Sequence, residues 1–202
     1  MRELRPIDGP VLERAYNEVF REAFPPQELK PLGAIRDMIS KGGYRVLALC
    51  GGEDELGYIC LWEDPPYVLI DYLCVPKGLR GGGIGGEIIA KTIEAYPEGT
   101  VFIGETEAPT GDPEADGMIL RRLEFYKRCG AVTLPYDTAI FGVHYRTIVW
   151  TDCEPEVGEV MRRHEGFYRR SFSPELYDAA VRVPLAEGES AEVTGKWDRW
   201  RQ

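Results

Sequence analysis

The sequence contains few residues that could bind a metal or build a disulfide framework. Its 202 residues include only two histidines, His144 and His164, and the five cysteines form no Cys-x-x-Cys pair. Zinc sites need several such ligands at short spacing, so we expect no metal. An odd number of cysteines favours free thiols in a reducing compartment.

The sequence also lacks long apolar runs and an excess of basic residues. No run approaches the roughly 18 apolar residues that a membrane span requires, and the opening MRELRPIDGP is unlike a secretory signal. We therefore expect a soluble, cytoplasmic protein that does not bind a membrane. Acidic residues outnumber basic ones by 34 to 24, for a net charge of −10. This balance opposes nucleic-acid binding and suits a cationic substrate, although it also serves solubility.

The most informative stretch runs from Asp71 to Gly86 and reads DYLCVPKGLRGGGIGG. An apolar segment ends at Pro76, a short polar turn follows, and a helical pattern begins near Ile84. A glycine-rich turn between a strand and a helix presents free backbone N–H groups to an anion. Glycine also lets a diphosphate approach the main chain, which a β-carbon would prevent. The stretch therefore predicts a phosphate-binding turn.

Two common phosphate sites do not fit this turn. A P-loop ends in Gly-Lys-Ser/Thr, which is absent here, so nucleotide triphosphate hydrolysis is poorly supported. A dinucleotide-binding fold needs Gly-x-Gly-x-x-Gly inside a β-α-β unit, whereas the preceding strands read as a meander.

The periodicity of apolar residues predicts an α/β protein in one domain with an extension. Helices are expected at 10–24, 28–40, 84–95, 118–129 and 156–171, and strands at 44–50, 56–62, 67–75, 100–107, 131–134 and 145–151. The strands at 67–75 and 100–107 flank one helix, so they should run parallel. Residues 108–117 are expected to form an acidic loop, and the tail from about 187 to be frayed.

Two motifs in this order of elements resemble the GNAT (GCN5-related N-acetyltransferase) superfamily. Arg80-Gly81-Gly82-Gly83-Ile84-Gly85 matches the family's Gln/Arg-x-x-Gly-x-Gly/Ala motif, and Val75-Pro76 precedes it at the family's spacing. Phe125-Tyr126-x-x-x-Gly130 resembles its second signature, with Ala131 where phenylalanine is usual. The resemblance implies a GNAT domain over residues 1–152, with a mixed central sheet, splayed parallel strands and flanking helices. Residues 153–202 would form a helical extension packed on the same domain.

The resemblance implies acetyl-CoA as the cosubstrate. Its pyrophosphate would bind the glycine turn, and its pantetheine arm and acetyl carbonyl would bind the preceding strand end. The implied CoA-binding residues are Leu73, Cys74, Val75, Arg80, Gly81, Gly82, Gly83, Ile84, Gly85, Gly86 and Tyr126. A backbone N–H at Val75 or Leu73 would stabilise the developing oxyanion.

Three residues are candidates for proton transfer. The resemblance places the Tyr126 hydroxyl near the CoA sulfur, where it would act as general acid, although its spacing with Ile119 and Leu123 also suits a core residue. Glu105 lies on the same strand face as Val101 and Ile103, and a carboxylate there calls for explanation. Asp71 on the neighbouring strand is the alternative general base. Glu105 could instead bind a substrate cation or order the loop at 108–117, and Asp71 could instead form a structural hydrogen bond.

The remaining reactive side chains have weaker patterns. Cys74 lies beside the expected acetyl site, but no histidine is near it in sequence, so we interpret it as a small buried residue. His164 lies on the apolar face of its helix and is expected to be a core histidine.

These observations favour direct acetyl transfer to a primary amine in a ternary complex. The acceptor could be a small amine or a peptide amine, and the acceptor-side segments 20–40 and 108–117 contain no readable specificity pattern. One alternative is a non-catalytic acyl-CoA binding module. Another is a structural protein that self-associates, for example as a homodimer, through the helix at 156–171.

Overall fold

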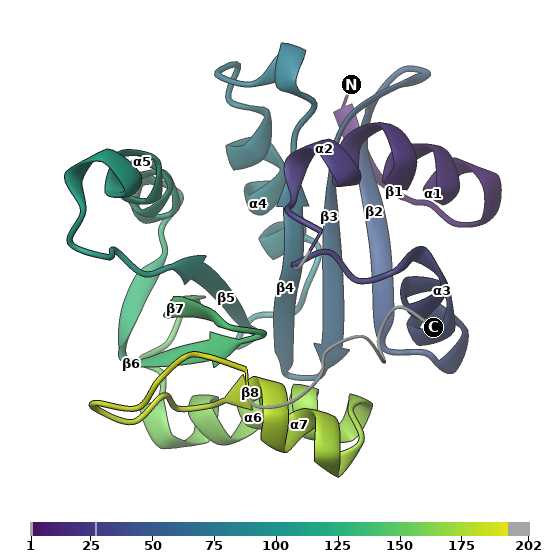
Figure 1. Cartoon of the computed structure of the whole chain (residues 1–202). Helices are drawn as coiled ribbons and strands as arrows, with labels where there is room; N and C mark the ends of the chain where they lie inside the picture. Colours follow the sequence, from purple (N-terminus) through teal and green to yellow (C-terminus); the bar gives the residue numbers. More distant parts are fainter. Residues whose placement is uncertain (1, 27, 194–202) are drawn as a thin grey trace. The chain divides into compact units, whose positions relative to one another are not determined.

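The computed structural model describes residues 2–26 and 28–193, and the chain divides at Pro97 into two compact units, which are described separately. Unit 1 contains β1 (Arg2–Pro6), α1 (Gly9–Ala15), a π-helical turn (Tyr16–Phe20), α2 (Arg21–Ala23), α3 (Leu32–Lys41), β2 (Tyr44–Gly51), β3 (Asp54–Asp64), β4 (Tyr67–Cys74), a 3₁₀ turn (Lys77–Leu79) and α4 (Ile84–Glu94). Unit 2 contains β5 (Val101–Glu107), α5 (Pro113–Arg128), β6 (Val132–Ile140), β7 (Val143–Trp150), α6 (Val157–Ser171), α7 (Pro174–Ala180) and β8 (Val181–Arg182) (Figure 1).

The strands of unit 1 pair in the order β1-β2-β3-β4, and every pairing is antiparallel. The two hairpins follow the turn residues Gly51-Gly52 and Asp64-Pro65-Pro66, as the sequence predicts. Strand β1 was not predicted, because four of its five residues are exposed and three are charged. Residues 2–6 form a strand because they pair with β2, for instance Leu4 opposite Leu49, and not because their own side chains show a strand pattern.

The helices of unit 1 lie on both faces of this sheet. Helices α1 and α3 and the π-helical turn pack on one face through Leu12, Ile35 and Phe20, which are fully buried. The Phe20 ring lies 5.6 Å from that of Tyr58 on β3. Helix α4 covers the other face so closely that a β-carbon at Gly57 would lie 2.8 Å from Ile88 Cδ1. Helix α3 begins at Leu32 and not at Glu28 as predicted, because Pro31 adopts φ −55° and ψ 143°.

The strands of unit 2 pair in the order β5-β7-β6-β8, again antiparallel. Helices α5 and α6 lie on opposite faces of this sheet (Figure 1). The Tyr126 ring of α5 contacts Trp150, which is paired with Phe102, whereas His164 and Tyr168 of α6 contact Glu105. Side chains alternate along β5, so Phe102 and Glu105 point to different faces.

Several predicted boundaries in unit 2 are wrong. Helix α5 begins at Pro113 and not at Met118, because Asp112 caps it by accepting from Glu114 N–H. The segment predicted as a short strand at 131–134 is the longer β6, whose bulge after Thr133 hides its alternation. The short elements α7 and β8 were not expected.

The α/β class is confirmed, with helices packed on the sheet of each unit. Helices α6 and α7 of the predicted extension belong to unit 2, while the boundary at 152 stays a prediction. The predicted tail lies partly outside the described residues, and 187–193 contain no helix or strand. Within the described chain, no helix is both long and apolar enough to cross a membrane.

Candidate functional site

The glycine turn of unit 1 joins β4 to α4 through the 3₁₀ turn at Lys77–Leu79. Gly81 and Gly83 adopt φ of 83° and 78°, which a residue with a β-carbon rarely adopts. Gly83 is the N-cap of α4 and provides no side chain to cap it. Glycine is therefore required at these two positions for the chain to turn from β4 into α4.

This helix N-terminus has unused hydrogen-bond donors. Across the part of the chain that the structure describes, the N–H groups from Gly81 to Gly86 donate to no protein acceptor. A β-carbon at Gly81 or Gly83 would meet no atom within 4 Å, so the space in front of the turn is open. Unused N–H groups, open space and the helix dipole are the features that favour an anion at a helix N-terminus.

Arg80 has a partner at this turn. Its Nε donates to the carbonyl oxygen of Val75 over 2.9 Å, which ties the turn to the end of β4. The side chain remains exposed to solvent. Arg80 therefore holds a positive charge beside the open space.

Strand β4 contains a β-bulge at Asp71, next to Tyr72. Cys60 of β3 pairs with Tyr72 and Leu61 pairs with Ile70, so Asp71 is an extra residue without a partner in β3. The bulge lets Asp71 and Tyr72, which are adjacent in sequence, both contact Lys30 from the connection between α2 and α3.

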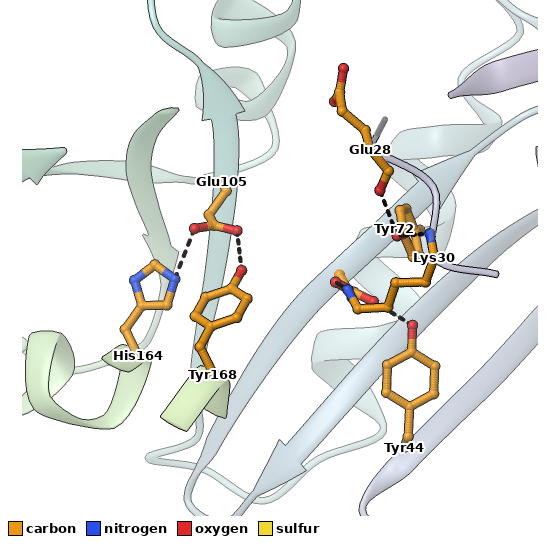
Figure 2. A network of polar contacts seen from close by, with 8 residues as sticks. Glu28, Lys30, Tyr44, Tyr72, Glu105, His164 and Tyr168 are labelled. Atoms are coloured by element: carbon orange, nitrogen blue, oxygen red, sulfur yellow. Dashed lines mark hydrogen bonds and ion pairs between the residues drawn. The ribbon is translucent and has the colours of Figure 1, made fainter. Parts of the chain in front are cut away.

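Asp71 forms a buried ion pair with Lys30. Their contact atoms, Nζ and Oδ1, are 2.6 Å apart, and the two side chains are 8% and 7% exposed. The Tyr44 hydroxyl donates to the other carboxylate oxygen of Asp71 over 2.5 Å (Figure 2). Burial and the charge of Asp71 raise the pKa of Tyr44 well above its usual value. Asp71 thus has a cation on one oxygen and a phenol on the other.

Glu105 of unit 2 lies in a second buried network. Its carboxylate accepts from Tyr168 Oη over 2.5 Å, and His164 Nε2 lies 3.1 Å from Oε1 (Figure 2). It also accepts from Thr138 Oγ1 over 2.9 Å. Burial acts to raise the pKa of Glu105, but the charge of His164 and these hydrogen bonds outweigh it and lower that pKa. Glu105 is therefore held as a carboxylate.

Tyr126 and Cys74 are both held in their protonated forms. The Tyr126 ring packs edge-on against Trp150 at 5.7 Å between centroids, and burial raises the pKa of its hydroxyl. Burial raises the pKa of the Cys74 thiol to about 12. A thiol with that pKa is almost wholly protonated at neutral pH, so Cys74 is a poor nucleophile.

The structure brings the predicted residues together only in part. Leu73, Cys74, Val75 and the glycine turn are continuous with Asp71 in unit 1, whereas Glu105 and Tyr126 lie on opposite faces of the sheet of unit 2. Sequence reasoning did not identify Lys30, Tyr44, Tyr168 or Thr138. The signal that could have found Tyr168 is its spacing of one helical turn from His164, which places both side chains on the same face of α6.

No protein-family model matches this sequence, and a search of curated protein sequences finds no significant match. Solved structures do match the fold. A protein of Bacteroides thetaiotaomicron assigned to the GNAT acetyltransferase family superposes with a TM-score of 0.67 at 21% identity, over 81% of this chain and 94% of that chain.

Two further solved structures have the same fold and contain CoA. A Bacillus subtilis acetyltransferase in complex with CoA has a TM-score of 0.54 at 13% identity, over 76% of this chain and 100% of that one. An aminoglycoside 6'-N-acetyltransferase complexed with coenzyme A has a TM-score of 0.53 at 14% identity, over 76% and 99%. The GNAT fold predicted from the two sequence motifs is therefore confirmed.

Proposed function

We propose that this protein, whose fold is that of the GNAT acetyltransferases, transfers an acetyl group from acetyl-CoA to a primary amine. The observation that carries the proposal is the glycine turn, where unused N–H groups face open space at the start of α4. An acetyltransferase fold with this turn supports a cosubstrate of the CoA type, as in the complexes named above.

The proposed CoA site follows the chain from β4 into α4. Gly81, Gly82, Gly83, Ile84, Gly85 and Gly86 would donate backbone N–H groups to the diphosphate, and Arg80 would add a cationic contact. Leu73, Cys74 and Val75 would bind the pantetheine arm and the acetyl carbonyl through their backbone. A backbone N–H at Val75 or Leu73 would stabilise the oxyanion that forms during transfer.

Direct transfer in a ternary complex is the chemistry that these residues support best. A base removes one proton from the acceptor ammonium, the neutral nitrogen attacks the acetyl carbon, a C–N bond forms and the C–S bond breaks. Tyr126 would donate its proton to the leaving sulfur and regain one from solvent, which also takes the second proton of the nitrogen. The high pKa of the Cys74 thiol opposes a route through an acetyl-cysteine.

The general base is better assigned to Asp71 than to Glu105. Hydrogen bonds from Tyr168 and Thr138, the charge of His164 and a lowered pKa make Glu105 a weak proton acceptor. Asp71 lies on the same strand as Leu73, and its partner at 2.6 Å is itself a primary ammonium group. That contact is the one that proton removal from an acceptor requires.

A non-catalytic acyl-CoA binding module remains the second candidate, because the phosphate-binding turn alone would serve it. Similar folds include a ribosomal-protein-S18-alanine N-acetyltransferase from Escherichia coli and the aminoglycoside enzyme, so amine acceptors of very different size occur on this fold. Thiol release from acetyl-CoA with a panel of primary amines separates the candidates, since a binding module would release none.

The proposed CoA site is tested by replacing Gly83 with aspartate. A β-carbon and a negative charge in front of the α4 N-terminus should disrupt at least one charge-assisted hydrogen bond, worth about 2 kcal/mol, or roughly a 30-fold weaker Kd for CoA. Isothermal titration calorimetry measures this change directly.

Gly52→Asp is the matched control for this variant. Gly52 also has a positive φ, 70°, and its β-carbon would likewise point into open space, so charge and backbone strain are comparable. Its Kd for CoA should stay within about twofold of wild type. Equal losses in the two variants would refute the assignment of the turn.

A further inference from the structure

Lys30 occupies an unusually complete site for an ammonium group. Its Nζ lies 2.6 Å from Asp71 Oδ1, 5.2 Å from the centroid of the Tyr72 ring and 5.8 Å from that of Trp62. An ammonium beside a carboxylate and two aromatic faces gains from both charge and ring quadrupoles. We name Asp71, Tyr44, Trp62 and Tyr72 the ammonium cage.

The ammonium cage is built from strands, whereas the lysine that occupies it comes from a connection between helices. All four cage residues are on β2, β3 and β4, whereas Lys30 lies in the connection between α2 and α3. The backbone at Glu28 and Lys30 is held in place, because Lys30 N–H donates to Tyr72 Oη, Tyr72 Oη donates to the Glu28 carbonyl, and Tyr16 Oη donates to the Lys30 carbonyl. The flexible four-carbon stem of lysine can leave the cage by rotation while this backbone stays in place.

The geometry of the cage selects one type of cation. Tyr44 already occupies Asp71 Oδ2, so a guanidinium would lose one of the two acceptors that it binds side by side. A quaternary ammonium has no N–H to donate and could not match the 2.6 Å contact. A primary alkylammonium, with several donors on a compact head, fits both limits.

We propose that the ammonium cage is the binding site for the acceptor's primary ammonium group, and that Lys30 fills it until an acceptor displaces it. This inference rests on the proposed function, because it places the acceptor beside the strand end proposed for the acetyl group. Asp71 then receives the proton of the ammonium that it binds. Lys30 acts as a tethered competitor that keeps the buried carboxylate paired in the free protein.

The cage is tested with Lys30→Ala and the probe n-propylammonium, which replaces the atoms that the substitution removes. Calorimetry should show binding to Lys30→Ala and at least tenfold weaker binding to Lys30→Met, whose unbranched stem fills the same space. Adding Asp71→Asn to Lys30→Ala should abolish binding. Equal binding to all three variants, or none to Lys30→Ala, would overturn the assignment of the cage.

Displacement is tested in the wild-type protein by the reactivity of Lys30. Its modification by acetic anhydride, followed by peptide mass spectrometry, should be slow relative to that of Lys41 in the free protein, and the ratio of Lys30 to Lys41 modification should rise at least tenfold with saturating n-propylamine. Lys41, which is exposed and paired with Asp37, is the internal reference, because the ratio corrects for the anhydride that the added amine consumes. If the modification of Lys30 relative to Lys41 does not change, the ion pair of Lys30 with Asp71 is a structural contact and not an acceptor site.

The two readouts are independent of turnover. If the protein releases no thiol from acetyl-CoA with any amine, the proposed function fails, yet binding of n-propylammonium to Lys30→Ala still reports on the cage. If thiol is released but neither readout responds, the acceptor binds elsewhere and only the further inference fails.

Discussion

Replacing Tyr126 with phenylalanine should lower kcat for acetyl transfer by about 100-fold and leave the Kd for CoA within about twofold of wild type. General acid catalysis contributes roughly 10²- to 10⁴-fold to a rate, and the variant removes only the hydroxyl that would protonate the sulfur. The ring, with its packing against Trp150, is kept. Thiol release and calorimetry on the same preparation measure the two quantities.

Tyr177→Phe is the matched control for Tyr126→Phe. Tyr177 is a buried tyrosine of unit 2, and its hydroxyl donates to Glu165 over 3.0 Å, between α7 and α6. Its loss should lower stability slightly and leave kcat within about twofold of wild type. If Tyr126→Phe retains the wild-type kcat, Tyr126 is a core residue and another group protonates the thiolate.

Replacing Glu105 with leucine should lower the free energy of unfolding by about 3–5 kcal/mol. Removing one partner from a buried charged network leaves the others without compensation, here His164, Tyr168 and Thr138. Glu107→Gln is the control, because Glu107 is two residues further along β5 and pairs with Arg122 at the surface, where a pair contributes about 1 kcal/mol or less. Urea unfolding at pH 7 compares them.

The contribution of Glu105 to the free energy of unfolding should decrease as the pH falls. Its pKa is lowered in the folded protein, so the carboxylate stabilises the fold above its usual value of 4.5. That contribution is lost as pH falls from 4.5 through the folded-state pKa. The difference in stability between wild type and Glu105→Leu should therefore shrink between pH 7 and pH 3. A difference that is constant over this range would show that Glu105 contributes through packing alone.

The glycine turn could be predicted from sequence because its constraints are local. Positive φ angles at Gly81 and Gly83 need glycine, and a helix start needs the apolar spacing of Ile84, Ile88 and Ile89. These requirements lie within a dozen residues and leave a pattern in the chain. The same holds for Gly51-Gly52 and for the periodic helix α6.

The ammonium cage could not be predicted, because its members are far apart in sequence. Lys30 stands between Leu29 and Pro31, in a segment that the sequence predicts as the start of a helix, and a lone lysine there is normally exposed. Its partner Asp71 is the extra residue of a β-bulge, and no residue type in β4 signals that bulge. Glu105 was singled out as a buried carboxylate, but its donors come from β6 and α6, whose contact with β5 the sequence does not encode locally.

The glycine turn is proposed to hold the diphosphate of CoA, and calorimetric titration with truncated ligands tests this role most directly. Wild type should bind CoA and dephospho-CoA with similar Kd values and pantetheine, which lacks the diphosphate, at least 100-fold more weakly, since two charge-assisted hydrogen bonds contribute about 3 kcal/mol or more. In Gly83→Asp the same ratio should fall to about tenfold or less. Equal affinity of wild type for CoA and pantetheine would contradict the claim.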